Sequence, residues 1–243
     1  MGEKVPYPQA FFQLQSEFAL KIAKIKGIFP DDALLKYTTF YIRIGGEDWE
    51  FDPTNELWQK YILQVHNQVN PAAAAYSMYF RKFYSGLPPK APDSCFSYEY
   101  DNNNKSVSIH FQNNFSDISS PLSAVNIPAR KNELRFIFQN IKANYPETRS
   151  VIGGTWLFAY EAYRRLFPPE YIAGLKVQNR GYKGNGRWGQ FIMNSGGLNQ
   201  ARADQFIESI KRAESEKELT NSFPYDYLET QAAINVFYRY FSV

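Results

Sequence analysis

The segment from Arg180 to Gly189 is rich in groups that bind anions. Its ten residues, RGYKGNGRWG, include three cations and four glycines. Glycine lets backbone N–H groups converge on an anion, and Arg and Lys neutralise phosphate or carboxylate groups. The composition therefore indicates binding of an anionic or phosphate-bearing small molecule, with CoA-like compounds and nucleotides as candidate cofactors. A flexible polar hairpin loop would have the same composition, and this second interpretation stays open.

An aromatic and a cationic residue that precede this segment complete the predicted ligand-binding set. The set is Trp156, Arg164, Arg180, Lys183, Arg187 and Trp188. Gly184, Gly186 and Gly189 also match the letters of the dinucleotide-binding fingerprint. That motif requires a helix directly after the glycines, whereas the run 190–193 is predicted to be extended. The fingerprint therefore does not identify a dinucleotide-binding domain.

Cys95 and His110 form a second candidate site. Apolar residues alternate with polar ones on both sides of the 101–104 turn, which predicts a β-hairpin. With these four residues as the loop, Cys95 lies opposite His110, and such a pair would activate the thiol as a nucleophile. A loop two residues longer matches the apolar faces equally and places Ser97 opposite His110. The sequence leaves both registers open, and it does not decide whether the chain is an enzyme.

The remaining ionisable residues predict no metal site. One cysteine and two histidines exclude a disulfide framework and a cage of several thiolates or imidazoles. Asp31, Asp32 and Asp52 are explained as residues at helix starts. The acidic residues of 47–50 lie in a loop marked by glycine, where nothing in the spacing pairs them.

Apolar residues at intervals of three and four predict about four helices in the first third of the chain. They are a helix with the stripe Phe11–Ile25 ended by Gly27, one from Asp31 or Asp32 to Gly45–Gly46, one beginning at Asp52–Pro53 and one beginning at Asn70–Pro71. The proline-rich stretch 86–92 cannot be helical and is the predicted boundary.

Helices and strands alternate after this boundary. The predicted order is a hairpin over 95–111, a helix around 134–141, a buried strand over 150–157, a helix over 160–166, extended segments over 175–195 and a helix over 203–210. The tail over 234–241 fits a helix or a strand, and the spacing of its apolar residues favours a helix. The predicted class is α+β, with an N-terminal bundle packed on a C-terminal mixed sheet. The predicted domains are 1–86 and 93–243, which can share one core because the linker is short.

Composition excludes several classes of protein. The net charge of +3 argues against a nucleic-acid partner, and a hydrophobic content of 44% excludes a disordered chain. No apolar stretch approaches the roughly 18 residues that a membrane span needs. The segment 1–8 lacks the apolar run of a secretory signal, so we expect a cytoplasmic protein.

Several short motifs resemble an uncharacterised family of bacterial proteins. They are ALLKYT at 33–38, FDP at 51–53, CFSY at 95–98, TWL at 155–157, EAYRRLFPP at 161–169 and WGQF at 188–191. The resemblance spans most of the chain and implies no particular activity.

A second resemblance covers residues 121–172. The order of Pro121–Ser123, a helix, Thr155–Leu157 and Leu166–Pro169 is similar to the C-terminal domain of some GNAT-like acyltransferases. Thr155 stands where that domain has Ser, and Gly153–Gly154 stands where it has a Cys-His pair. The resemblance implies a relation to acyltransferases without carrying over their chemistry.

These observations lead to one principal functional prediction and two alternatives. The principal prediction is a ligand-binding protein for an anionic small molecule. The first alternative is a non-catalytic protein–protein interaction module with an exposed aromatic patch. The second is an enzyme that depends on Cys95 and His110.

Overall fold

A computed structural model describes residues 6–46, 51–85, 94–113 and 120–243. Within these ranges the chain forms two compact units, and the predicted α+β class is confirmed. One unit is helical and contains the described part of 6–85 together with 179–226. The other contains the sheet and consists of 94–178 and 227–243, apart from the gap at 114–119. The predicted domain 93–243 is therefore divided, while the predicted linker 86–92 and the acidic residues of 47–50 lie outside the described residues.

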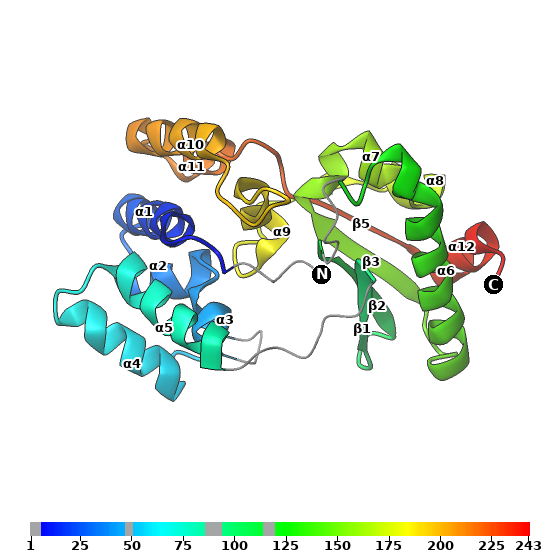
Figure 1. Ribbon diagram of the computed structural model, residues 1–243, viewed down its shortest axis with the longest axis horizontal. Helices are drawn as coiled ribbons and strands as arrows, with labels where there is room; N and C mark the ends of the chain where they lie inside the picture. Colours follow the sequence, from blue (N-terminus) through cyan, green and yellow to red (C-terminus); the bar gives the residue numbers. More distant parts are fainter. Residues whose placement is uncertain (1–5, 47–50, 86–93, 114–119) are drawn as a thin grey trace. The chain divides into compact units, whose positions relative to one another are not determined.

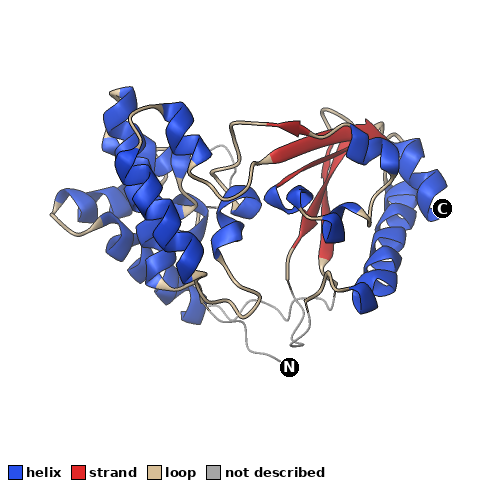
Figure 2. Ribbon diagram, turned by 90° about the horizontal axis from the view of Figure 1, so that it is seen from above, coloured by secondary structure: helices blue, strands red, loops and turns tan. Residues whose placement is uncertain are grey.

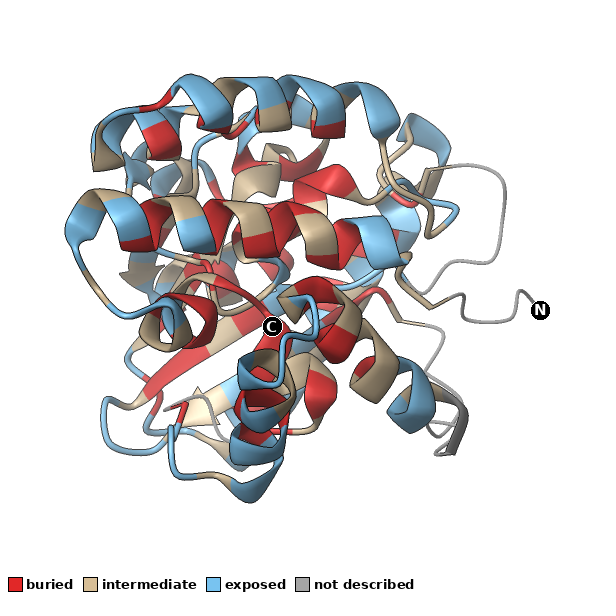
Figure 3. Cartoon of the chain, turned by 90° about the vertical axis from the view of Figure 1, so that its left-hand side faces the viewer, coloured by how far each residue is buried: buried red, intermediate tan, exposed pale blue. Residues whose placement is uncertain are grey.

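The helical unit is built from two separate stretches of chain (Figure 1). Its helices are α1 (Gln9–Lys26), α2 (Pro30–Tyr37), α3 (Phe40–Ile44), α4 (Glu56–His66), α5 (Pro71–Ser85), α9 (Asn185–Trp188), α10 (Gln200–Arg212) and α11 (Glu216–Asn221). Buried and exposed residues alternate along the helices on this side of the molecule, as Figure 3 shows. Each helix thus turns an apolar stripe toward a common core.

Two of the predicted helix boundaries are confirmed. Gly27 ends α1 in the left-handed conformation, with φ of 64°, which glycine adopts without steric cost. Asn70 caps α5, because its side-chain oxygen accepts hydrogen bonds from the N–H groups of Ala72 and Ala73 at 3.0 and 3.1 Å.

The predicted second helix is divided in two at Thr38. The Thr38 backbone is extended, and its hydroxyl donates to the Leu34 carbonyl, so the side chain replaces a helical bond. The next N–H group, of Thr39, donates to the Gln15 side chain at 2.7 Å. A contact from α1 therefore holds the chain out of the helix at this point.

The predicted third helix begins later than expected. Asp52 accepts hydrogen bonds from Thr54 within a turn, and Asn55 caps the helix that begins at Glu56. Asn55, and not the predicted Asp52, is therefore the residue that caps this helix.

The sheet unit contains five strands. They are β1 (Phe96–Asp101), β2 (Ser106–Phe111), β3 (Ser150–Thr155), β4 (Lys176–Val177) and β5 (Leu228–Ala233), in the spatial order β1-β2-β3-β5-β4. The pair β2–β3 is parallel, and the other pairs are antiparallel, so the sheet is mixed. The hairpin and the strand after residue 149 confirm the sequence prediction, whereas β5 was not predicted.

Helices cover one face of this sheet, as Figures 1 and 2 show. They are α6 (Ile127–Asn144), α7 (Glu161–Arg164), α8 (Pro169–Ala173) and α12 (Ile234–Phe241). The rings of Phe138 from α6 and Phe237 from α12 stack at 4.8 Å, above the fully buried Val107 and Val151 of the strands. The predicted helical tail is therefore part of the core of the unit.

The predicted extended segments over 175–195 are largely wrong. Only two residues of this region, in β4, belong to the sheet, and a short helix, α9, begins directly after Gly184 and includes Gly186. Arg187 and Trp188 are adjacent in sequence, and Phe191 follows them by four and three positions. All three side chains are buried. Helical turns place them together in the core, which an extended chain would not do.

Among the described residues, no helix combines the length and apolar composition that crossing a bilayer requires.

Candidate binding groove beside an open sheet edge

The predicted anion-binding segment packs its most distinctive side chains into the helical unit. Arg187 and Trp188 are 1% and 0% exposed. The Arg187 guanidinium carbon lies 5.0 Å from the ring centroid of Tyr182 and 4.8 Å from that of Phe223. Cation–π contacts of this kind stabilise a buried guanidinium, so Arg187 has a packing role in this unit.

The other cations of the segment also make contacts within the helical unit. The Lys183 ammonium lies 4.4 Å from the ring centroid of Phe51. Arg180 is exposed, and its carbonyl accepts a hydrogen bond from Arg187 Nε at 3.2 Å. Arg43 of α3 donates to the Asn185 side chain at 2.8 Å and thereby adds a cation that sequence reasoning missed.

The two remaining ligand-binding candidates belong to the sheet unit. The Trp156 ring packs against Tyr160 with centroids 5.6 Å apart. Arg164 donates to Glu161 at 3.2 Å. The six predicted residues are therefore divided, with four in the helical unit and two in the sheet unit.

The observed hairpin register does not pair Cys95 with His110. Ser97 lies opposite His110, as in the longer of the two loops that the sequence allows. His110 Nε2 lies 3.5 Å from a carboxylate oxygen of Glu99, and both side chains are exposed. Cys95 is buried, so the predicted thiol–imidazole pair is not formed.

Cys95 instead belongs to a cluster with two residues of α6. Its sulfur accepts a hydrogen bond from Arg130, which is 3% exposed and forms an ion pair with Glu133. The Glu133 carboxylate also accepts from the Cys95 backbone N–H at 3.0 Å. This cluster fixes the beginning of β1 against the first half of α6.

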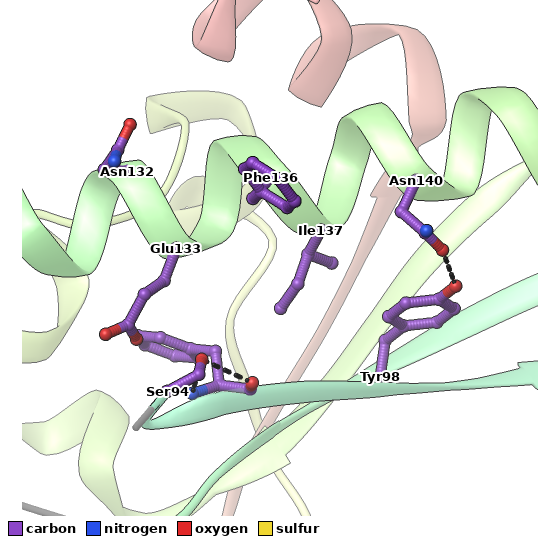
Figure 4. Close-up of a pocket in the computed structure, with 8 residues that line it drawn as sticks. Ser94, Tyr98, Asn132, Glu133, Phe136, Ile137 and Asn140 are labelled. Carbon is purple, nitrogen blue, oxygen red and sulfur yellow. Dashed lines mark hydrogen bonds between the residues drawn. The ribbon is translucent and has the colours of Figure 1, made fainter. Parts of the chain in front are cut away.

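A groove of about 470 Å³ lies between β1 and α6 (Figure 4). Its lining residues are Ser94, Phe96, Tyr98, Asn132, Glu133, Phe136, Ile137 and Asn140. Ile137 points from α6 toward the strand, and the Phe136 ring is 73% exposed on the same helix. We call this feature the β1–α6 groove.

The hydrogen bonds of the hairpin show which backbone groups of β1 point toward β2 and which point toward the outer edge of the sheet. β1 is the first strand in the sheet order and pairs only with β2 among the described strands. Gln112 N–H donates to the Cys95 carbonyl at 2.9 Å, in the β1–β2 register. In an antiparallel pair, residues bonded in this way alternate with residues whose N–H and C=O point away from the partner strand. The backbone groups of Phe96, Tyr98 and Tyr100 therefore point to the outer edge of the sheet.

Ser94 supports this assignment. Its hydroxyl donates to the Phe96 carbonyl at 2.9 Å and accepts from the Phe96 N–H at 3.2 Å. Both groups of Phe96 are thus directed away from β2, and the serine satisfies them locally. The same hydroxyl would have to move if another strand were to pair with this part of the edge.

The side chains of β1 also link the strand to α6. The Tyr98 hydroxyl donates to the Asn140 side chain, and burial of the ring raises the pKa of Tyr98. The Tyr100 hydroxyl donates to Glu147, just beyond the helix. Burial and this bond raise the pKa of Tyr100 to about 12, and the same bond lowers the pKa of Glu147. These contacts link β1 to α6 and to the residues just after it.

The sequence contains one signal for this groove. The apolar stripe of α6 consists of Leu134, Ile137, Phe138 and Ile141, and Phe136 lies outside it. A large aromatic residue outside the stripe of a helix is exposed unless something covers it.

Among residues 6–46, 51–85, 94–113 and 120–243, no three His, Cys, Asp or Glu side chains cluster in a way that could hold a metal ion. Comparisons of the chain with models of known protein families, with curated proteins and with solved structures find no match.

Proposed function

We propose that the chain is a protein-interaction module that binds an extended polypeptide segment in the β1–α6 groove. The observation that carries this proposal is the outward direction of the backbone groups of Phe96, Tyr98 and Tyr100. An added strand would form main-chain hydrogen bonds with these groups, which is how peptides bind to open sheet edges in several unrelated folds.

The lining of the groove defines the side chains that such a segment needs. In an added strand, every second side chain would face α6. There it would contact Phe136 and Ile137, which favour an apolar or aromatic residue. The other side chains would face the opposite side of the sheet, so a segment with alternating apolar and polar residues fits.

Selection from a displayed library of random eight-residue peptides tests this proposal. The protein concentration in the selection is kept low enough that light scattering gives the mass of a single chain. We expect a selected peptide to bind about tenfold more weakly to Phe136→Glu, equivalent to about 1.4 kcal/mol, because the carboxylate is desolvated in the groove. Fluorescence anisotropy with the synthetic peptide measures this difference.

The matched control is Phe29→Glu, because Phe29 is 79% exposed in the helical unit. This variant should bind the peptide like the wild type, and both substitutions should change stability by no more than about 0.5 kcal/mol. Peptide binding should also slow amide exchange at Tyr98 and Tyr100 and leave Ser97 and Glu99 unchanged. Selection of no peptide, or equal binding by both variants, would contradict the proposal.

A second candidate function is binding of an anionic or phosphate-bearing small molecule by the helical unit. The observation that favours it is the hydrogen bond from Arg43 to Asn185, which places another cation beside the predicted 180–189 segment. The resemblance to an acyltransferase domain makes a CoA-like compound the first ligand to try, followed by nucleotides and sugar phosphates.

Thermal unfolding in the presence of these compounds tests the second candidate. We expect one of them to raise the midpoint of unfolding, and Lys183→Ala or Arg43→Ala to remove the shift. Arg187→Ala is unsuitable as the test variant because this side chain is buried in the core. The absence of a shift with all of the compounds would eliminate this candidate.

A further inference from the structure

The proposed interaction function leaves the identity of the bound segment open. We infer that this segment is β1 of a second copy of the chain, so that two copies form a dimer by antiparallel pairing of their β1 strands. This inference rests on the proposed function, because it uses the same outer edge and the same groove. It follows from the few registers that a two-fold arrangement allows.

A two-fold axis restricts the pairing of β1 with itself. The outward groups of Phe96, Tyr98 and Tyr100 must lie opposite one another, since residues bonded to β2 have no groups to offer. This condition excludes every register in which an odd-numbered residue lies opposite an even-numbered one. The remaining registers are centred on single residues of the strand.

Overlap and charge then select one register. Centring the axis on Tyr98 or on Glu99 gives the longest overlap of the two strands, which run from Phe96 to Asp101. The Glu99-centred register places Glu99 opposite its own symmetry mate, and like charges directly opposite are destabilising. The Tyr98-centred register places Glu99 opposite Ser97 of the second copy, and no two acids of β1 are opposed. Self-pairing is therefore compatible with the charges of the strand in this one long register.

The side chains over the sheet agree with this arrangement. In the Tyr98-centred register, the two Tyr98 rings would be neighbours, and Phe96 would lie opposite Tyr100 of the second copy. Aromatic cross-strand pairs of this kind stabilise antiparallel sheets. Helix α6 would meet its symmetry mate across the groove, where the 73% exposed Phe136 ring would be covered. The exposed aromatic residue and the open edge thus have the same explanation.

Disulfide trapping tests both the dimer and its register. Ser97 and Glu99 are exposed, and in the expected register each lies opposite the other in a pair without hydrogen bonds, where side chains are closest. We expect an equimolar mixture of full-length S97C and E99C chains in a glutathione redox buffer to form a cross-linked dimer. Either variant alone should cross-link at least about tenfold less, because the diagonal distance exceeds what a disulfide spans.

Controls separate the possible results. Wild-type protein reports any cross-link through the native Cys95, and thermal unfolding shows that the variants fold. Adding Phe136→Glu to both chains should prevent cross-linking by placing two carboxylates near the axis, whereas adding Phe29→Glu should not. Light scattering of the wild type should give twice the chain mass of 28.2 kDa as the concentration rises.

Other outcomes overturn the inference. Cross-linking by S97C alone or E99C alone would show a different register, and a monomer mass at all concentrations would exclude the dimer. If the monomer nevertheless binds library peptides in the groove, the interaction function stands and only the choice of partner is wrong. If neither a second copy nor a peptide binds, both proposals fail.

Discussion

The 180–189 segment and the β1–α6 groove differ both in their composition and in how accessible their side chains are. The segment has the cations and glycines expected of an anion site, yet Arg187 and Trp188 are almost completely buried. The groove has an ordinary composition, yet it combines a sheet edge that no other described strand pairs with and the exposed ring of Phe136. Residue types therefore indicate what chemistry a segment can perform, whereas packing determines which of these groups a ligand can reach.

The largest expected effect is on stability and concerns Trp188, a buried residue of the 180–189 segment. Trp188→Ala should lower the free energy of unfolding by about 3–5 kcal/mol, because it leaves a cavity among the rings of Phe18, Phe206 and Phe223. Trp156→Ala is the matched control, since that ring is only half-buried, and should cost about 1 kcal/mol. Urea denaturation measures both. Equal costs would show that Trp188 is less well packed than the structure indicates.

The next effect concerns the cluster that attaches β1 to α6. Arg130→Met should destabilise the chain by about 3 kcal/mol, because it leaves the mostly buried Glu133 carboxylate without its ion-pair partner. The double variant with Glu133→Gln should recover part of this loss, since the uncompensated charge is then removed. Urea denaturation of the four proteins of this cycle gives the coupling energy, and strictly additive costs would contradict the ion pair between Arg130 and Glu133.

The smallest expected effect concerns the pKa of Tyr100, near the C-terminal end of β1. The pKa of Tyr100 is about 12 in the folded chain and near 10 when the chain is unfolded. The folded state thus favours the protonated phenol, so its contribution to stability is present below pH 10 and is lost as the pH rises through about 12. Glu147→Gln should move the Tyr100 titration to lower pH, as followed by NMR of its ring carbons. An unchanged titration would show that Glu147 does not hold this hydroxyl.

Local signals were sufficient for the elements whose ends are fixed by their own residues. Gly27 and Asn70 mark a helix end and a helix start through their own backbone and side-chain preferences. The break at Thr38 could not be predicted in this way, because it depends on Gln15 in another helix. Both hairpin registers place apolar residues opposite one another, so the alternation alone could not select the observed register.

The position of β1 at the edge of the sheet could not be predicted from local sequence patterns either. The hairpin itself was predicted, but its position at the end of the sheet depends on the pairing of β2 with β3 and of β3 with β5. The strand β5, with the sequence LETQAA, lacks the apolar alternation that identifies a half-buried strand. The groove could therefore be recognised only from the strand order. The position of Phe136 outside the apolar stripe of its helix is the one sign of the groove that the sequence contains.

The position of β5 has a consequence for the synthesis of the chain. β5 lies between β3 and β4 in space but follows both of them in sequence, after the second stretch of the helical unit. A ribosome delivers the chain from its N-terminus, so β3 and β4 emerge before the strand that joins them. Until then β3 presents an unpaired edge, which is a site for aggregation. The nascent chain therefore exposes this edge of β3 while residues 179–226 are being made, and the β3–β5–β4 part of the sheet forms only after residues 228–233 have followed them.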